Sequence, residues 1–219
     1  MAFFTVNTTA EAVREPQGGN YLSKSGIYPV TLKIVSVTTN DHNARSLNFN
    51  VDYEGSENTL YGLKLDNNDG TANYQQRIFN NLCVVAGLQG SISDPEIQTH
   101  NLGKDKKPTD LSVLTDFTDI PVFIRIKEVY SLYNNKLQSR KEIVGFYRAE
   151  DKASASEIVN GTEAGVQYNK DLEYASDVTY KDGLTAEKVA ALKEAEKSGS
   201  APAAQTAAVT KPTKNLFAS

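Results

Sequence analysis

The sequence predicts a mainly β domain, a small barrel of five strands with one inserted helix, followed by an extra C-terminal helix and a disordered tail. Apolar and polar residues alternate with a period of two in two blocks, which is the pattern of half-buried strands. A segment of helical period separates the blocks, and Asn, Asp and Gly clusters stand between the strands. The composition, 39% hydrophobic and 23% charged over 219 residues, is typical of a globular chain with polar loops or a tail.

The first block predicts a meander of three antiparallel strands within residues 26–65. In residues 26–37 alternate side chains from Tyr28 to Ile34 are apolar and share one face. Residues 46–53 alternate most regularly, with Leu47 and Tyr53 at the ends of the apolar face. Residues 59–65 follow as a third strand.

The period then changes to that of a helix. Within residues 73–88 the positions that recur at helical spacing are Tyr74, Ile78, Leu82 and Val85. Glycines 87 and 90 are stop signals, so we expect one amphipathic helix packed on the sheet. Residues 88–119 are polar and rich in Asp, and we expect a long loop or short helical turns there.

The second block predicts a long hairpin, with strands at 120–133 and 136–150 joined at Asn134-Asn135. The remaining chain divides by composition. Residues 1–20 are expected to be a flexible arm, 21–150 the domain, and 151–197 an extension. Within that extension we expect a short helix at 153–159 and a second helix at 184–197, with Thr185 as the N-cap of the second. Residues 198–219 are expected to be a disordered tail.

Three strands, a helix and a two-stranded hairpin are the element order of an oligonucleotide-binding (OB) barrel. Such barrels bind single strands by a positive groove and by aromatic rings on which bases stack. The whole chain has a net charge of −4. Residues 120–150 nevertheless carry six basic and three acidic residues, net +3, which places a basic hairpin in an acidic protein.

The predicted interface combines aromatic and basic side chains of this hairpin with three residues of the meander. An isolated aromatic residue on a strand more often packs in the core, and a lone cation is usually solvated, so only their co-location favours binding. Removing charge at Arg125 and Lys127 is expected to lower affinity similarly for all sequences. The candidate nucleic-acid-binding residues are Phe123, Arg125, Lys127, Tyr130, Tyr133, Lys136, Arg140, Lys141, Tyr147 and Arg148, with Lys33, Tyr61 and Lys64.

Motifs of enzymes and of cofactor sites are missing from the sequence. It contains no phosphate-binding loop, no dinucleotide-binding glycine turn and no nucleophile elbow. His42 and His100 lie in polar turns, and the single Cys83 excludes a disulfide framework. Residues 66–70 resemble a calcium loop but lack its later glutamate, so we interpret them as a turn. We therefore predict no catalytic residue, no metal and no cofactor.

No stretch approaches the ~20 apolar residues of a membrane span. The first residues also lack the pattern of a secretory signal. The expected location is the cytoplasm.

Four short strings carry a family resemblance: residues 26–34 (GIYPVTLKI), 47–51 (LNFNV), the helix end at 85–88 (VAGL) and 120–126 (IPVFIRI). Over roughly residues 20–150 the chain resembles phage-encoded single-stranded DNA-binding proteins with an OB fold. The resemblance implies sequence-independent coating of single strands in DNA replication and recombination, without catalysis, in the cytoplasm of the host cell.

The tail departs from that family, whose members commonly end in an acidic segment with a terminal aromatic residue. Residues 198–219 contain Lys211 and Lys214 and no acidic residue. Self-inhibition by the tail is therefore not expected. Leu216 and Phe217 keep an apolar tip that would dock phage replication or recombination proteins.

Two other hypotheses stay open at this stage. The chain could be a phage structural or scaffold interaction protein built on a β-barrel, with its aromatic residues in a protein interface. A small nuclease is the weaker alternative, because no carboxylate cluster has metal-binding spacing. The sequence does not determine the oligomeric state, the number of nucleotides bound or a preference between DNA and RNA. It also leaves open the protein partners and whether residues 151–197 pack on the barrel.

Overall fold

The computed structural model describes residues 20–88, 90–102 and 106–197 of the chain. They belong to two compact units. The first contains the chain up to Val129 together with Ser139–Thr179, and the second contains Tyr130–Gln138 and the chain from Tyr180 onward. Of the predicted arm at 1–20 only Asn20 is described, and the predicted tail with Leu216 and Phe217 lies outside the described residues.

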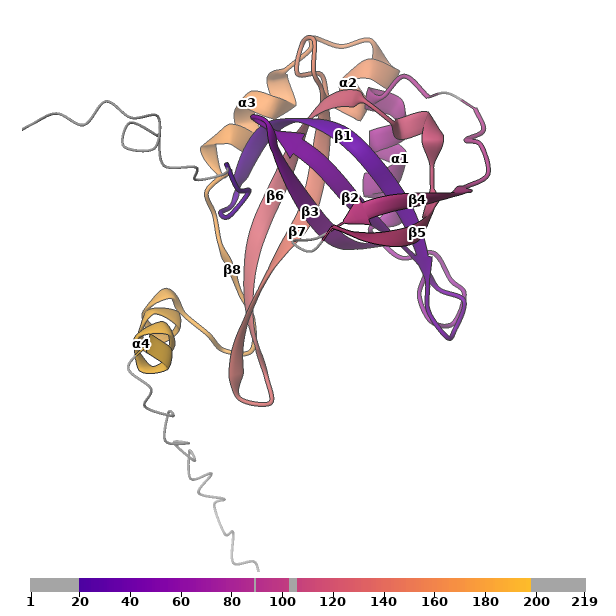
Figure 1. The fold of residues 1–219 in the computed structure, drawn as a ribbon. Helices are drawn as coiled ribbons and strands as arrows, with labels where there is room; N and C mark the ends of the chain where they lie inside the picture. The colour runs from indigo at the N-terminus through magenta and orange to yellow at the C-terminus, as the bar shows by residue number, and fades with distance from the viewer. Residues whose placement is uncertain (1–19, 89, 103–105, 198–219) are drawn as a thin grey trace, which may run out of the picture. The chain divides into compact units, whose positions relative to one another are not determined.

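The predicted meander is confirmed in the first unit (Figure 1). Strands β1 (Gly26–Thr39), β2 (Arg45–Tyr53) and β3 (Ser56–Lys64) pair antiparallel in sequence order. The alternation determines which face is buried, since Leu47, Phe49 and Val51 are at most 1% exposed while the residues between them are partly exposed. These side chains form the centre of the hydrophobic core.

Helix α1 (Gln76–Val85) is the predicted inserted helix, and it buries Leu82 and Val85 in the core. It begins later than the periodicity indicates. Tyr74, expected on the apolar face, precedes the helix and is 74% exposed. The reason is a turn at Asn73, whose carbonyl oxygen accepts from the Gln76 N–H and whose side chain accepts from the Gln75 N–H.

The expected loop at 88–119 is instead largely a β-hairpin. Strands β4 (Glu96–Leu102) and β5 (Lys107–Val113) pair antiparallel, and a 3₁₀ turn, η1 (Thr115–Phe117), follows. Most of the hairpin is exposed or partly exposed on both faces, so it has no regular alternation of apolar residues from which the sequence could reveal it. It joins the sheet where β5 pairs with Ser36 and Val37 of β1.

The second predicted block forms β6 (Ile120–Tyr133) and β7 (Lys136–Arg148). β6 pairs antiparallel with the first half of β1, from Leu32 opposite Ile120 to Gly26 opposite Ile126, and its other partners include β7. Among the described residues β3 pairs only with β2, and β7 only with β6. The sheet is therefore antiparallel and not closed, so the closed barrel expected from the element order is not formed.

Part of the extension belongs to the first unit. Helices α2 (Ala155–Asn160) and α3 (Val166–Glu173) follow β7, and Ala155 is part of the core. α2 begins with a capping box, in which the Ser154 hydroxyl accepts from the Glu157 N–H and the Glu157 carboxylate accepts from the Ser154 N–H. Figure 1 shows α3 beside β6.

The second unit contains the hairpin tip, Tyr180 of the two-residue strand β8 (Thr179–Tyr180), and helix α4 (Ala186–Lys197). Asn134 and Asn135 both have positive φ, as the predicted two-residue turn requires. The helix predicted at 184–197 is confirmed, and the Thr185 hydroxyl accepts from the Lys188 N–H at 3.3 Å. Tyr130 stacks on Tyr180 with 6.0 Å between ring centroids.

Candidate nucleic-acid interface

A groove of about 840 Å³ lies in the first unit where the sheet stays open. We call it the β3–β7 groove. One wall is Thr59–Lys64 of β3 and the other is Ser139–Ile143 of β7, and Ser23 and Asn73–Gln75 complete the lining. Since β3 and β7 each pair with one neighbour among the described residues, the groove lies between two free strand edges.

The β3 wall presents Tyr61 through a β-bulge. The β2–β3 register shifts between Leu47 and Phe49, which leaves Tyr61 and Gly62 without simple partners on β2. Gly62 has φ +80° and donates its N–H to Asn48 Oδ1 at 3.0 Å. Bulges change the direction of neighbouring side chains, and here the Tyr61 side chain is 72% exposed.

The segment before α1 adds a second exposed ring. Gln75 Oε1 accepts from the Lys64 N–H at 2.8 Å, which ties this segment to the end of β3. Tyr74, beside it, therefore stands at the groove next to Lys64. Sequence reasoning missed Tyr74 because its spacing fits the helix. The signal that could have identified it is Asn73, a helix-start residue immediately before it.

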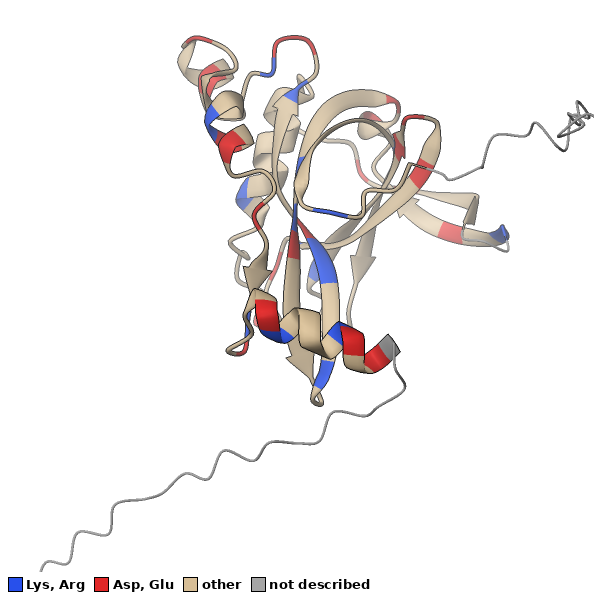
Figure 2. Ribbon diagram, turned by 90° about the vertical axis from the view of Figure 1, so that its left-hand side faces the viewer, with Lys and Arg blue, Asp and Glu red and all other residues tan. Residues whose placement is uncertain are grey.

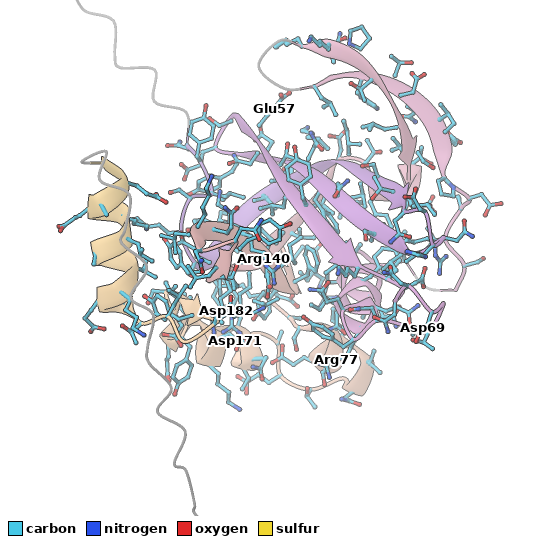
Figure 3. The ribbon with its side chains drawn as sticks, turned by 90° about the horizontal axis from the view of Figure 1, so that it is seen from below. Glu57, Asp69, Arg77, Arg140, Asp171 and Asp182 are labelled. Atoms are coloured by element: carbon cyan, nitrogen blue, oxygen red, sulfur yellow. The ribbon has the colours of Figure 1, made fainter. Side chains whose placement is uncertain are left out.

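The β7 wall supplies positive charge. Arg140 and Lys141 line the groove there, and Arg140 makes an exposed ion pair with Glu142 at 2.5 Å. Exposed pairs of this kind are weak, about 0–1 kcal/mol, so a phosphate can compete for the guanidinium. Within the described part of the chain, Lys141 and Lys64 make no ion pair. Basic residues recur along the β6–β7 hairpin (Figure 2), and Arg140 is labelled in Figure 3.

Three predicted interface residues make contacts within the protein instead of facing the groove. Phe123 and Tyr147 both pack edge-on against Tyr168 of α3, each with 5.3 Å between ring centroids. Arg125 forms an ion pair with Asp171 of α3, to which Tyr147 also donates at 2.5 Å. Tyr147 is 3% exposed, and burial together with the Asp171 hydrogen bond raises its pKa well above the usual range.

The structure therefore does not bring Phe123, Arg125 and Tyr147 into the groove. On β6, Phe123 and Arg125 lie on the face opposite Ile124, which is in the core. A later helix covers that second face. We leave these three residues out of the proposed interface.

The remaining candidates also lie outside the groove lining. Lys33 pairs with Asp119 at 2.7 Å, and Arg148 pairs with Asp151 at 2.6 Å, which lowers the pKa of Asp151 to about 2. Lys127 is partly buried on β6. Tyr130, Tyr133 and Lys136 belong to the second unit, where Tyr130 is 5% exposed and Tyr133 69%. The groove thus brings together Tyr61, Lys64, Arg140 and Lys141 of the predicted set.

Replacing Arg125 by methionine tests this reassignment. Arg125→Met is expected to lower the free energy of unfolding by about 1–3 kcal/mol, because it leaves Asp171 without its cation in a half-buried site. It is expected to leave affinity for oligo-dT unchanged. Urea unfolding and fluorescence anisotropy measure the two effects. Lys33→Met, which breaks an exposed pair, is the control and should cost about 0–1 kcal/mol. Weakened binding at unchanged stability would return Arg125 to the interface.

Within the described ranges no three His, Cys, Asp or Glu side chains are grouped as metal ligands, and no helix is long and apolar enough to cross a membrane. Burial raises the pKa of the Cys83 thiol to about 11, so it stays protonated at neutral pH.

A scan against protein-family models and a search of curated proteins find no match for this chain. Its classification rests on the fold and the groove: a β-rich protein with an open sheet whose free edges enclose exposed tyrosines and cations.

Proposed function

We propose that the protein binds single-stranded DNA without sequence preference, through the β3–β7 groove. The observation that carries the proposal is the juxtaposition of two exposed rings, Tyr61 and Tyr74, with Lys64, Arg140 and Lys141 at one groove. Rings that stack on bases and cations that follow the phosphates are the two components of non-specific single-strand binding. The local balance is three cations against the carboxylate of Glu142.

The same residues favour single strands over duplex. The groove requires bases that can leave their neighbours and lie on tyrosine rings, and in a duplex the bases are already stacked and paired. Stacking accepts every base, because every base has a π-face. We infer a fold that is related to the OB barrel but open between β3 and β7, with β1–β3, α1 and the β6–β7 hairpin as its parts, and this opening holds the strand.

The biological role that we propose is coating of single strands in phage DNA replication and recombination. It rests on the family resemblance of residues 20–150 together with the groove chemistry. Coating would protect the strand and melt its hairpins.

A binding comparison tests the proposal. Labelled oligo-dT and a mixed-sequence single strand should bind with similar affinity, and a duplex of equal length much more weakly. Three phosphate contacts predict that log K falls with log salt at a slope of about −2. Fluorescence anisotropy at several salt concentrations measures all of this. No binding of oligo-dT at low salt would overturn the proposal and favour the structural or scaffold interaction protein.

A further inference from the structure

A short strap of chain before β1 is fixed to the start of β3. The Asn20 N–H donates to the Ser56 hydroxyl at 3.0 Å, and the Leu22 N–H donates to Asn58 Oδ1 at 2.8 Å. The Asn58 amide donates in turn to the Asn20 carbonyl at 3.1 Å. Asn58 is 8% exposed, so a buried amide holds the strap on both sides of Tyr21.

This strap presents Tyr21 to solvent. Leu22 is completely buried in the core, and its neighbour Tyr21 is 67% exposed. Ser23, two residues further on, lines the β3–β7 groove. A large exposed ring thus stands two residues from the groove lining, on a backbone that is hydrogen-bonded on both sides.

The exposed rings are spaced along β3. The residues on either side of Tyr21 are hydrogen-bonded to Asn58, Tyr61 lies three residues further along the strand, and Gln75, which follows Tyr74, is hydrogen-bonded to Lys64, three residues further again. At the strand rise of ~3.3 Å per residue, successive positions among Asn58, Tyr61 and Lys64 of β3 are about 10 Å apart. A row of separated rings suits successive bases of an extended strand better than one compact ligand.

We infer that Tyr21 is a third base-stacking ring, so that the bound strand continues along β3 beyond the groove. The inference rests on the proposed function and adds the direction in which the bound strand leaves the groove. Asn58 is the positioning residue, since it fixes the backbone on which Tyr21 stands. Figure 3 labels Glu57, which precedes Asn58 at this end of β3.

The charges at this end determine how Tyr21 would act. Glu54 and Glu57 stand in or beside the β2–β3 turn and outnumber Lys24, the exposed cation that follows the strap, so the net charge there does not attract phosphate. Any gain in affinity from Tyr21 must therefore come from stacking. Losing the ring should weaken binding and leave the salt slope unchanged, whereas losing Lys141 should reduce the slope by about 0.7.

Oligonucleotide length separates the two proposals. Full-length wild type and Tyr21→Ala are titrated with oligo-dT of about 4 and about 12 nucleotides, both within the range of site sizes of OB folds. We expect Tyr21→Ala to bind the 4-mer like wild type and the 12-mer roughly 5- to 150-fold more weakly. Tyr21→Phe should restore 12-mer binding, because it keeps the ring. Tyr174→Ala, which removes a ring that is 58% exposed beside α3, is the matched control.

Each outcome has one meaning. If wild type binds neither oligonucleotide, the proposed function fails. If wild type binds both and Tyr21→Ala binds the 12-mer equally well, the path beyond the groove is wrong while the function stands. If Tyr21→Ala weakens binding of the 4-mer and the 12-mer equally, or changes the salt slope, Tyr21 is not a separate stacking position.

Discussion

Replacing Tyr61 and Tyr74 together by alanine is expected to weaken oligo-dT binding by about 2–6 kcal/mol, or about 30- to 20,000-fold. Each ring that stacks on a base contributes about 1–3 kcal/mol by alanine substitution. Both side chains are more than 70% exposed, so each substitution should change the free energy of unfolding by no more than about 0.5 kcal/mol. Anisotropy titration with oligo-dT measures the loss, and urea unfolding confirms the intact fold.

Two further variants make the result specific. Tyr61→Phe with Tyr74→Phe keeps the rings and should bind nearly as wild type does, which separates stacking from hydroxyl hydrogen bonds. Tyr174→Ala should also bind as wild type, because Tyr174 lies outside the groove lining. If the double alanine variant keeps full affinity while wild type binds oligo-dT, the groove is not the binding site.

The single variants show how the two rings share the strand. Tyr61 and Tyr74 stand on different elements, one on the β3 bulge and one before α1. If each ring stacks on its own base, the losses in binding free energy of the two single alanine variants should add up to that of the double variant, since rings without shared partners behave independently. A loss in the double variant smaller than the sum would mean that both rings contact the same base.

The sequence revealed most strands because burial on one face imposes alternation. Leu47, Phe49 and Val51 are recognisable for that reason, and so is the face of β6 that carries Ile124. Alternation also identifies the opposite face, but it does not say what covers that face. Phe123 and Arg125 were expected at a ligand, and they contact Tyr168 and Asp171, more than forty residues later in the chain.

The groove itself depends on two local irregularities that periodicity does not show. A one-residue bulge at Tyr61–Gly62 shifts the strand register, and a turn at Asn73 moves Tyr74 off the helix. Tyr61 and Lys64 could be chosen from their strand positions. Their proximity to Arg140 and Lys141 follows only from the fold, because β3 and β7 are separated by about seventy residues of chain.

Glu157 supports the helices that cover β6 and β7. Its carboxylate accepts from the backbone N–H groups of Ser154 at 2.8 Å, Gln167 at 2.7 Å and Gly165 at 3.2 Å, and the side chain is 8% exposed overall. It thus joins the start of α2 to the start of α3. Burial alone would raise its pKa, but these donors hold the pKa below its ordinary value of 4.5.

Replacing Glu157 by alanine is expected to lower the free energy of unfolding by about 2–5 kcal/mol. It removes the acceptor of three N–H groups, two of them buried, and each unpaired buried donor costs about 1–3 kcal/mol. Urea unfolding at pH 7 measures the effect. Glu163→Ala is the matched control, because Glu163 is an exposed carboxylate in the loop between α2 and α3 and should change stability by less than about 0.5 kcal/mol.

The pH dependence distinguishes the charge of Glu157 from its size. Because the folded pKa lies below the unfolded one, the carboxylate stabilises the fold fully above about pH 4.5. That contribution disappears as the pH falls through the folded pKa. Glu157→Gln keeps the shape without the charge, so its deficit against wild type should be largest at neutral pH and shrink in acid. A deficit that is constant from pH 7 to pH 3 would mean that packing, and not the ionised acceptor, joins the two helices.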